Sequence, residues 1–270
     1  MMNKDELLVS LRNSVVFRTV LAPAVMLRKR KEEMEYRRLR DSAVIRKYKN
    51  THPGERCFVI GNGPSLTVAD LELLKGEVTF ATNGIYNIFD QTDWRPSFYM
   101  SMDNSYLDSQ IDEIKKHVPG RKFLNFSCRR YGRRKSDNIV YFLIKGPYTP
   151  DRGKFYQKDI SEDVSRYFAQ TFSVTTTCIE FAIYMGFKEI YLIGVDNNYT
   201  TAKSEGQATH FYSAAGGLKK VVHYADNQIK SYELYKEFAE AHGCRIYNAT
   251  RGGKLEVYPR VNLDEIVGNH

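Results

Sequence analysis

The sequence predicts an α/β protein built on a Rossmann-like, mostly parallel sheet with helices on both faces. An apolar run, Cys57–Ile60, leads directly into the glycine-rich turn 61–65, as expected for a strand that is buried on both faces. A hydroxyl-rich segment, residues 173–177, begins an apolar helix that stops at Gly186. The strongest apolar run of the chain, residues 189–196, follows that helix. Helices that alternate with parallel strands in this way form a doubly wound sheet.

Length and composition favour one domain with an appended segment. The chain has 270 residues, of which 42% are hydrophobic and 13% aromatic, and this content argues against disorder of the whole chain. We expect residues 1–50 to form a basic amphipathic helical extension and residues 51–270 to form the sheet domain. Four widely separated cysteines form no C-x-x-C pair, so the sequence indicates neither a zinc site nor a disulfide framework, and reduced thiols in the cytoplasm are expected.

The first 50 residues combine apolar and basic side chains. The apolar stretch Val15–Leu27 is too short to span a bilayer, and the basic run Arg28–Lys31 follows it at once. Such a helix can lie in a membrane interface and attract anionic headgroups, or it can pack on the domain or on another subunit of a homo-oligomer. Its apolar half argues against a nucleic-acid partner. We expect peripheral contact with the inner face of the cell membrane.

The remaining elements are predicted in order along the chain. Residues 197–222 show little periodicity and several Gly and Ser residues, so we interpret them as a lid or substrate loop. Further strands are predicted at 78–82, 97–102, 122–125 and 139–142, then a loop at about 145–160, a helix at 226–241 and a last strand at 244–248.

Polar residues follow several of the predicted strands. In an open α/β sheet, ligands bind beyond the carboxyl ends of the strands, so these residues should meet at one edge. Most are neutral amides and hydroxyls, which suit recognition of ribose, base and sugar hydroxyls. Ser65 is also expected to cap the next helix, whose N-terminus favours an anion. The residues gathered by this rule are Asn62, Ser65, Asn83, Asp103, Asn104, Asp196 and Asn198.

The sequence predicts no metal site and two candidate general bases. No D-x-D motif is present, and Asp103 and Asp196 are more often turn residues than metal ligands. His210 and His223 flank the predicted lid, and histidine is a credible general base because its ordinary pKa lies near neutrality. A catalytic role is favoured over a structural one for His223, whereas the two roles are evenly balanced for His210.

Two segments resemble a known enzyme family. Val59–Leu66 resembles the opening motif of the bacterial sialyltransferases of glycosyltransferase family 42, and Gly186–Asp196 is similar to their second signature. His223 lies where that family places its catalytic histidine, before the last long helix. The chain also resembles the wider domain-of-unknown-function 115 group, which includes motility accessory factors and hydroxymethylpterin pyrophosphokinase-like proteins. The ending Asn-Ala-Thr-Arg-Gly-Gly, residues 248–253, is typical of that wider group.

The sialyltransferase resemblance implies a CMP-activated donor bound without a metal or other cofactor, and inversion at the anomeric carbon. It implies that His223 deprotonates the acceptor hydroxyl, with His210 as the alternative base. Asn198 stands where the family has Tyr, although Tyr199 is adjacent, and Asp103–Asn104 replaces the Asn after the third strand. The residues implied to hold the donor are Asn62, Gly63 and Ser65 at the phosphate and ribose, Asn83 at the nucleotide, the pair Thr175 and Thr176, and Gly194 under the cytidine.

These observations together predict a glycosyltransferase of bacterial polysaccharide biosynthesis. It would move a sialic-acid-like sugar onto a cell-surface glycan or lipid-linked acceptor. Two alternatives stay open: an ATP-dependent pyrophosphokinase of the hydroxymethylpterin type, and a non-catalytic nucleotide-binding protein.

Overall fold

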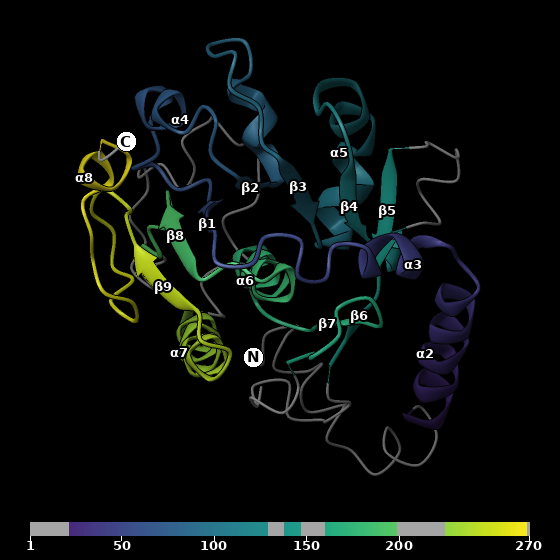
Figure 1. Cartoon of the computed structure of the whole chain (residues 1–270). Coiled ribbons are helices and arrows are strands. Elements are labelled where there is room, and N and C mark those ends of the chain that lie inside the picture. The colour runs from purple at the N-terminus through teal and green to yellow at the C-terminus, as the bar shows by residue number, and fades with distance from the viewer. Residues whose placement is uncertain (1–21, 129–137, 147–159, 199–224, 269–270) are drawn as a thin grey trace, which may run out of the picture.

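A seven-stranded parallel sheet forms the centre of the molecule, with the strand order β5-β4-β3-β2-β1-β8-β9 (Figure 1). The computed structural model describes residues 22–128, 138–146, 160–198 and 225–268. The predicted Rossmann-like class is confirmed. The strands of the sheet are β1 (Arg56–Ile60), β2 (Thr79–Thr82), β3 (Phe98–Ser101), β4 (Lys122–Asn125), β5 (Ile139–Phe142), β8 (Glu189–Ile193) and β9 (Arg245–Asn248).

Successive side chains of each strand enter two different cores, one on each face of the sheet. Cys57 and Val59 of β1 belong to one core, and Phe58 and Ile60 belong to the other. Because both faces are buried, the strands read as apolar runs in the sequence. The first face is covered by α3 (Asp41–Arg46), α6 (Val174–Met185) and α7 (Ala225–Ala241), and the second by α4 (Val68–Leu73), α5 (Asn104–His117) and α8 (Leu263–Val267) (Figure 1).

The first strand of the sheet, β1, lies in its middle, and the path of the chain from there determines where a ligand site is expected. It passes from β1 outward to β5 and then returns, so that β8 pairs with β1 on the side opposite β2. Two short 3₁₀ helices, η2 (Asn83–Ile88) and η3 (Phe126–Cys128), follow β2 and β4 directly. The strand order therefore reverses at β1 and β8, and a ligand crevice is expected beyond their carboxyl ends.

The segment before the sheet packs on the domain through a few side chains. Tyr36, in α2 (Ala22–Arg37), is 1% exposed and packs edge-on against Phe126, with ring centroids 5.5 Å apart. Ile45 in α3 is fully buried. A small parallel pair, β6 (Ile144–Lys145) and β7 (Phe168–Ala169), was not predicted: β6 borders the loop expected at about 145–160, and β7 follows it. Its strands are two residues long, which is too short for a recognisable pattern.

Candidate functional site

The loops after β1 and β8 press against each other at the carboxyl edge. The Gly61 amide donates to the Ile193 carbonyl at 2.8 Å, and the Gly63 amide donates to the Gly194 carbonyl at 2.8 Å. A Cβ atom at Gly61 would lie 2.4 Å from the Gly194 carbonyl oxygen, so only glycine fits at this contact. The glycine-rich turn therefore allows two backbones to approach at the point where the strand order reverses.

We call the contact between the loops after β1 and β8 the junction, and Asp196 is its buried carboxylate. It is 6% exposed, and its Oδ2 accepts a hydrogen bond from the Ser65 hydroxyl at 2.8 Å. A Cβ atom at Gly63 would lie 1.8 Å from that same Oδ2. The β1 loop is therefore shaped around the Asp196 side chain, and the Ser65 hydroxyl is already donating within the protein.

The prediction that Ser65 caps the following helix is wrong. Thr67 is the N-cap of α4: its hydroxyl accepts from the Asp70 amide at 3.2 Å, and the Asp70 carboxylate accepts from the Thr67 amide at 3.0 Å. The spacing Thr-x-x-Asp satisfies two otherwise free amides reciprocally, and this explains why the helix begins two residues later than Ser65 suggested.

Two asparagines join the carboxyl ends of β1, β2 and β3. The Asn62 side-chain amide donates to the Thr82 carbonyl at 2.9 Å, and this acceptor fixes the orientation of the carboxamide. The Oδ1 atom of Asn62 is buried and has no hydrogen-bond partner among the described residues. Asn83 has a left-handed backbone (φ +44°), and its Oδ1 accepts from the Ser101 hydroxyl at 2.8 Å. The buried Oδ1 atom of Asn62 suits a ligand hydroxyl or amino group better than a phosphate, because it can only accept a hydrogen bond.

The N-terminus of α6 lies near the same edge. Ser173 is its N-cap, and the Thr177 hydroxyl contacts the Met102 sulfur at 3.3 Å, just beyond β3. Thr176 is fully buried and its hydroxyl donates to the Ser173 carbonyl at 2.6 Å, whereas Thr175 is 6% exposed. The free amides and the dipole of a helix N-terminus favour an anion here.

Other predicted site residues lie at the edge but are exposed. Asp103 caps α5 by accepting from the Tyr106 amide at 2.8 Å, and the Asn104 side chain accepts from that of Asn125 at 3.2 Å. Asn198 is exposed. Across the described ranges, no group of three or more His, Cys, Asp or Glu side chains could hold a metal ion. Tyr199, His210 and His223, and most of the predicted lid, lie outside the described residues.

One buried carboxylate, Glu180, belongs to α6 itself. Glu180 is 1% exposed; it accepts from the Ser161 amide at 2.9 Å and from the Tyr235 hydroxyl at 2.7 Å. Burial raises the pKa of Glu180 to about 7, although these hydrogen bonds act in the opposite direction. Its hydrogen bonds run to Ser161, Ala169 and Tyr235 and to no residue of the loops after β1 and β8, so we interpret it as a structural group.

The C-terminal segment 250–254 contributes to the site, and this contribution was not predicted from the sequence. The Lys254 amide donates to the Asp196 carbonyl at 2.6 Å, and the Thr250 hydroxyl accepts from the Val195 amide at 3.1 Å. The glycines of the motif at 248–253 were the available signal, since Gly252 and Gly253 both have positive φ angles.

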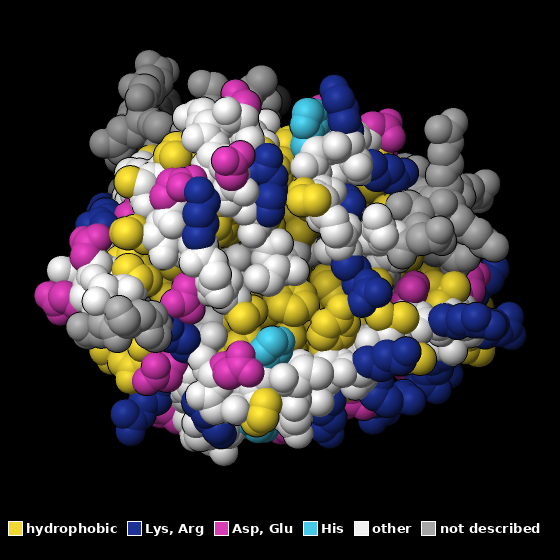
Figure 2. All heavy atoms as spheres, turned by 45° about the horizontal axis from the view of Figure 1, so that its top comes forward, with side chains coloured by type: hydrophobic (Ala, Val, Ile, Leu, Met, Phe, Trp, Pro, Cys, Tyr) yellow, Lys and Arg dark blue, Asp and Glu magenta, His cyan; other side chains and the backbone are white. Residues whose placement is uncertain are grey.

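A group of basic side chains lies on the side of the molecule formed by α2 and α3. Figure 2 shows Lys and Arg side chains along the right-hand side, where Figure 1 places α2 and α3. In α2, Leu27 is 69% and Met34 53% exposed. None of the described helices is long and apolar enough to cross a membrane. Peripheral membrane contact through residues 1–50 stays a prediction.

The fold and the junction together define an α/β protein of the Rossmann-like class, in which the strand order reverses at β1 and β8. The chain belongs to the family described as MptE-like, 6-hydroxymethylpterin diphosphokinase MptE-like, which matches residues 33–202. This confirms the resemblance to the wider group that includes the pterin enzymes; the sialyltransferase resemblance is not shown.

Comparison with other proteins adds little. No curated protein matches the chain. The enoyl-acyl carrier protein reductase of Bacillus cereus, solved with NADP+ and indole naphthyridinone, is 12% identical over 74% of this chain and 72% of that one, with a TM-score of 0.27. The NADH-dependent enoyl-acyl carrier protein reductase of Aquifex aeolicus VF5 is 12% identical over 73% and 72%, with a TM-score of 0.23. Likeness at this level supports no conclusion about function.

Proposed function

We propose that the protein is a nucleotide-dependent transferase whose donor lies across the loops after β1 and β8. The observation that carries this proposal is the close contact between Gly61 and Gly194, which brings the loops after β1 and β8 together where the strand order reverses. The N-terminus of α6 would attract the phosphates, while the oxygens of Asn62 and Asp196 would accept ligand hydroxyl or amino groups.

Family membership favours transfer of a diphosphoryl group from ATP to a hydroxymethylpterin-like alcohol. The alcohol oxygen would attack the β-phosphorus, the bond from that phosphorus to the α-phosphate oxygen would break, and AMP would leave as the alcohol proton passes to a base. Mg²⁺ carried by the triphosphate neutralises charge in such reactions and needs only one or two protein carboxylates. Asp196, whose Oδ2 accepts a hydrogen bond from Ser65, would be the carboxylate that contributes.

Glycosyl transfer from a CMP-activated sugar is the second candidate. It is favoured by the neutral character of the edge, where amides and hydroxyls surround a single buried carboxylate. The acceptor hydroxyl would attack the anomeric carbon, CMP would leave, and His223 or His210 would take the proton. The acceptor would be a surface glycan or lipid-linked precursor.

The test is a comparison of released nucleotides with the full chain. ATP with Mg²⁺ and 6-hydroxymethylpterin should yield AMP only when the alcohol is present, and EDTA should stop the reaction. CMP release from CMP-sugars that persists in EDTA would instead assign glycosyl transfer. Binding of a nucleotide without turnover of either kind would identify a non-catalytic protein, and absence of nucleotide binding would refute the proposal.

A further inference from the structure

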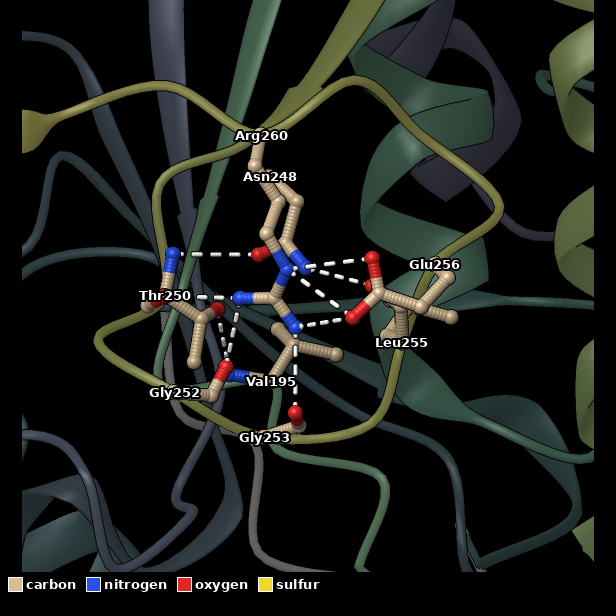
Figure 3. Close-up of polar contacts among 8 residues, drawn as sticks. All are labelled: Val195, Asn248, Thr250, Gly252, Gly253, Leu255, Glu256 and Arg260. Atoms are coloured by element: carbon tan, nitrogen blue, oxygen red, sulfur yellow. Dashed lines mark hydrogen bonds and ion pairs between the residues drawn. The ribbon is translucent and has the colours of Figure 1, made fainter.

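Arg260 holds the backbone of the 250–253 turn in place (Figure 3). Its guanidinium donates to the carbonyls of Gly252 at 2.6 Å, Gly253 at 3.0 Å and Thr250 at 3.3 Å. Glu256 in turn accepts from the same guanidinium at 2.7 Å, which fixes the orientation of the arginine. One planar guanidinium therefore binds three carbonyls of a turn in which two residues have positive φ.

The same turn bears directly on Asp196. A Cβ atom at Gly253 would lie 2.7 Å from both the Cα and the carbonyl oxygen of Asp196, so the turn is packed against the Asp196 backbone. The next residue, Lys254, donates its amide to that carbonyl at 2.6 Å. On the other side, Gly63 closes on the Asp196 carboxylate. Asp196 is thus held between the β1 loop and a turn whose shape depends on Arg260.

We propose that Arg260 is a positioning residue for the ligand site: it orders the 250–253 turn, and the turn fixes the Asp196 carboxylate for the donor nucleotide. This inference rests on the proposed function. Arg260 comes from the segment after β9, outside the matched family region, and it contacts no other described site residue except through the turn. Lysine cannot replace it fully, because an ammonium lacks the planar fork that reaches several carbonyls.

The test compares Arg260→Gln with Arg251→Gln by calorimetric titration with whichever of CMP, CDP or ATP with Mg²⁺ stabilises the wild type most. Arg251 is a matched control from the same turn. Its side chain points to Asp70 and Asp264, at 2.7 and 2.9 Å, and not to the turn carbonyls. Both variants should lower the melting temperature, but only Arg260→Gln should weaken nucleotide binding, by ten-fold or more. Arg260→Lys should give an intermediate affinity.

Hydrogen exchange separates failure of this inference from failure of the proposed function. If Arg260 positions the turn, the Lys254 amide should lose protection in Arg260→Gln and keep it in Arg251→Gln. Unchanged Lys254 protection, or wild-type nucleotide affinity in Arg260→Gln beside a lowered melting temperature, would overturn the inference. A wild-type chain that binds no nucleotide would overturn the proposed function, and with it the role of the turn in ligand binding.

Discussion

The loops after β1 and β8 and the loop after β3 lie at the same edge of the sheet, yet they are built in different ways. At the first junction Asp196 is 6% exposed and is enclosed by Gly63, Ser65 and Gly253. After β3, Asp103 is exposed, and its carboxylate caps the helix that starts at the next residue. Both aspartates follow a buried strand, but segments distant in the chain surround only one of them.

This difference shows what determines whether a carboxylate at a strand end caps a helix or is enclosed by distant segments of the chain. The local sequence places Asp103 one residue before a helix, where its carboxylate accepts a hydrogen bond from the Tyr106 amide of the first turn. No helix begins at the described residues 197 and 198, and contacts from the β1 loop and the C-terminal turn hold Asp196 in place. We therefore expect substitutions at the junction to change ligand binding, and substitutions after β3 to change stability alone.

Gly63→Ala should have the largest effect. The added Cβ would lie 1.8 Å from Asp196 Oδ2, and overpacking of this kind costs roughly 3 kcal/mol. Nucleotide binding should be lost, as measured by titration on folded protein. Gly76→Ala is the control, because nothing lies within 4 Å of its Cβ position and only its positive φ is unfavourable. If Gly63→Ala binds nucleotide as the wild type does, the junction is not the ligand site.

Glu180 tests whether the scaffold can be changed without changing the site. Its pKa is raised to about 7 in the folded protein, so between about pH 5 and pH 8 the folded state holds this proton more tightly than the unfolded state. The free energy of unfolding should therefore fall by about 2 kcal/mol as the pH rises through this range. In Glu180→Gln that contribution should vanish, which urea titrations at each pH would show. Parallel pH profiles for the two proteins would contradict the assignment.

Asp196→Asn should weaken nucleotide binding about ten-fold, or about 1.4 kcal/mol, with little loss of stability. The substituted amide oxygen can still accept from Ser65, so the fold of the junction is kept while the charge is removed. Titration and thermal unfolding of the same preparation separate the two effects. An equal loss in both would mean that Asp196 is only structural.

Asp103→Ala should have the smallest effect. Loss of an N-cap costs about 1 kcal/mol, and we expect a matching fall in the free energy of unfolding. Nucleotide affinity should not change. A weaker affinity in this variant would remove the distinction between the two loops and extend the ligand site across β3.

Local pattern was enough to predict most of the elements. Apolar runs predicted the strands of the sheet, because strands buried on both faces contain few polar side chains. Most strand ends agree within about one residue, whereas β8 stops at Ile193, three residues before the predicted end. The hydroxyl-rich segment 173–177 as the start of α6 and Gly186 as its end were also predicted, since capping depends on side chains within a few residues. The Ser65 cap failed because Thr67 and Asp70 form a better local pair, two residues further along.

The sequence by itself determined the fold class, the wider group to which the family belongs and the edge at which polar residues gather. Only the tertiary structure decided which of those residues are enclosed. Ser65 donates to Asp196 across 131 positions of the chain, and Thr250 accepts from Val195 across 55. Such contacts leave no periodic trace, because they depend on the return of the chain to β1 and not on the spacing of neighbouring residues.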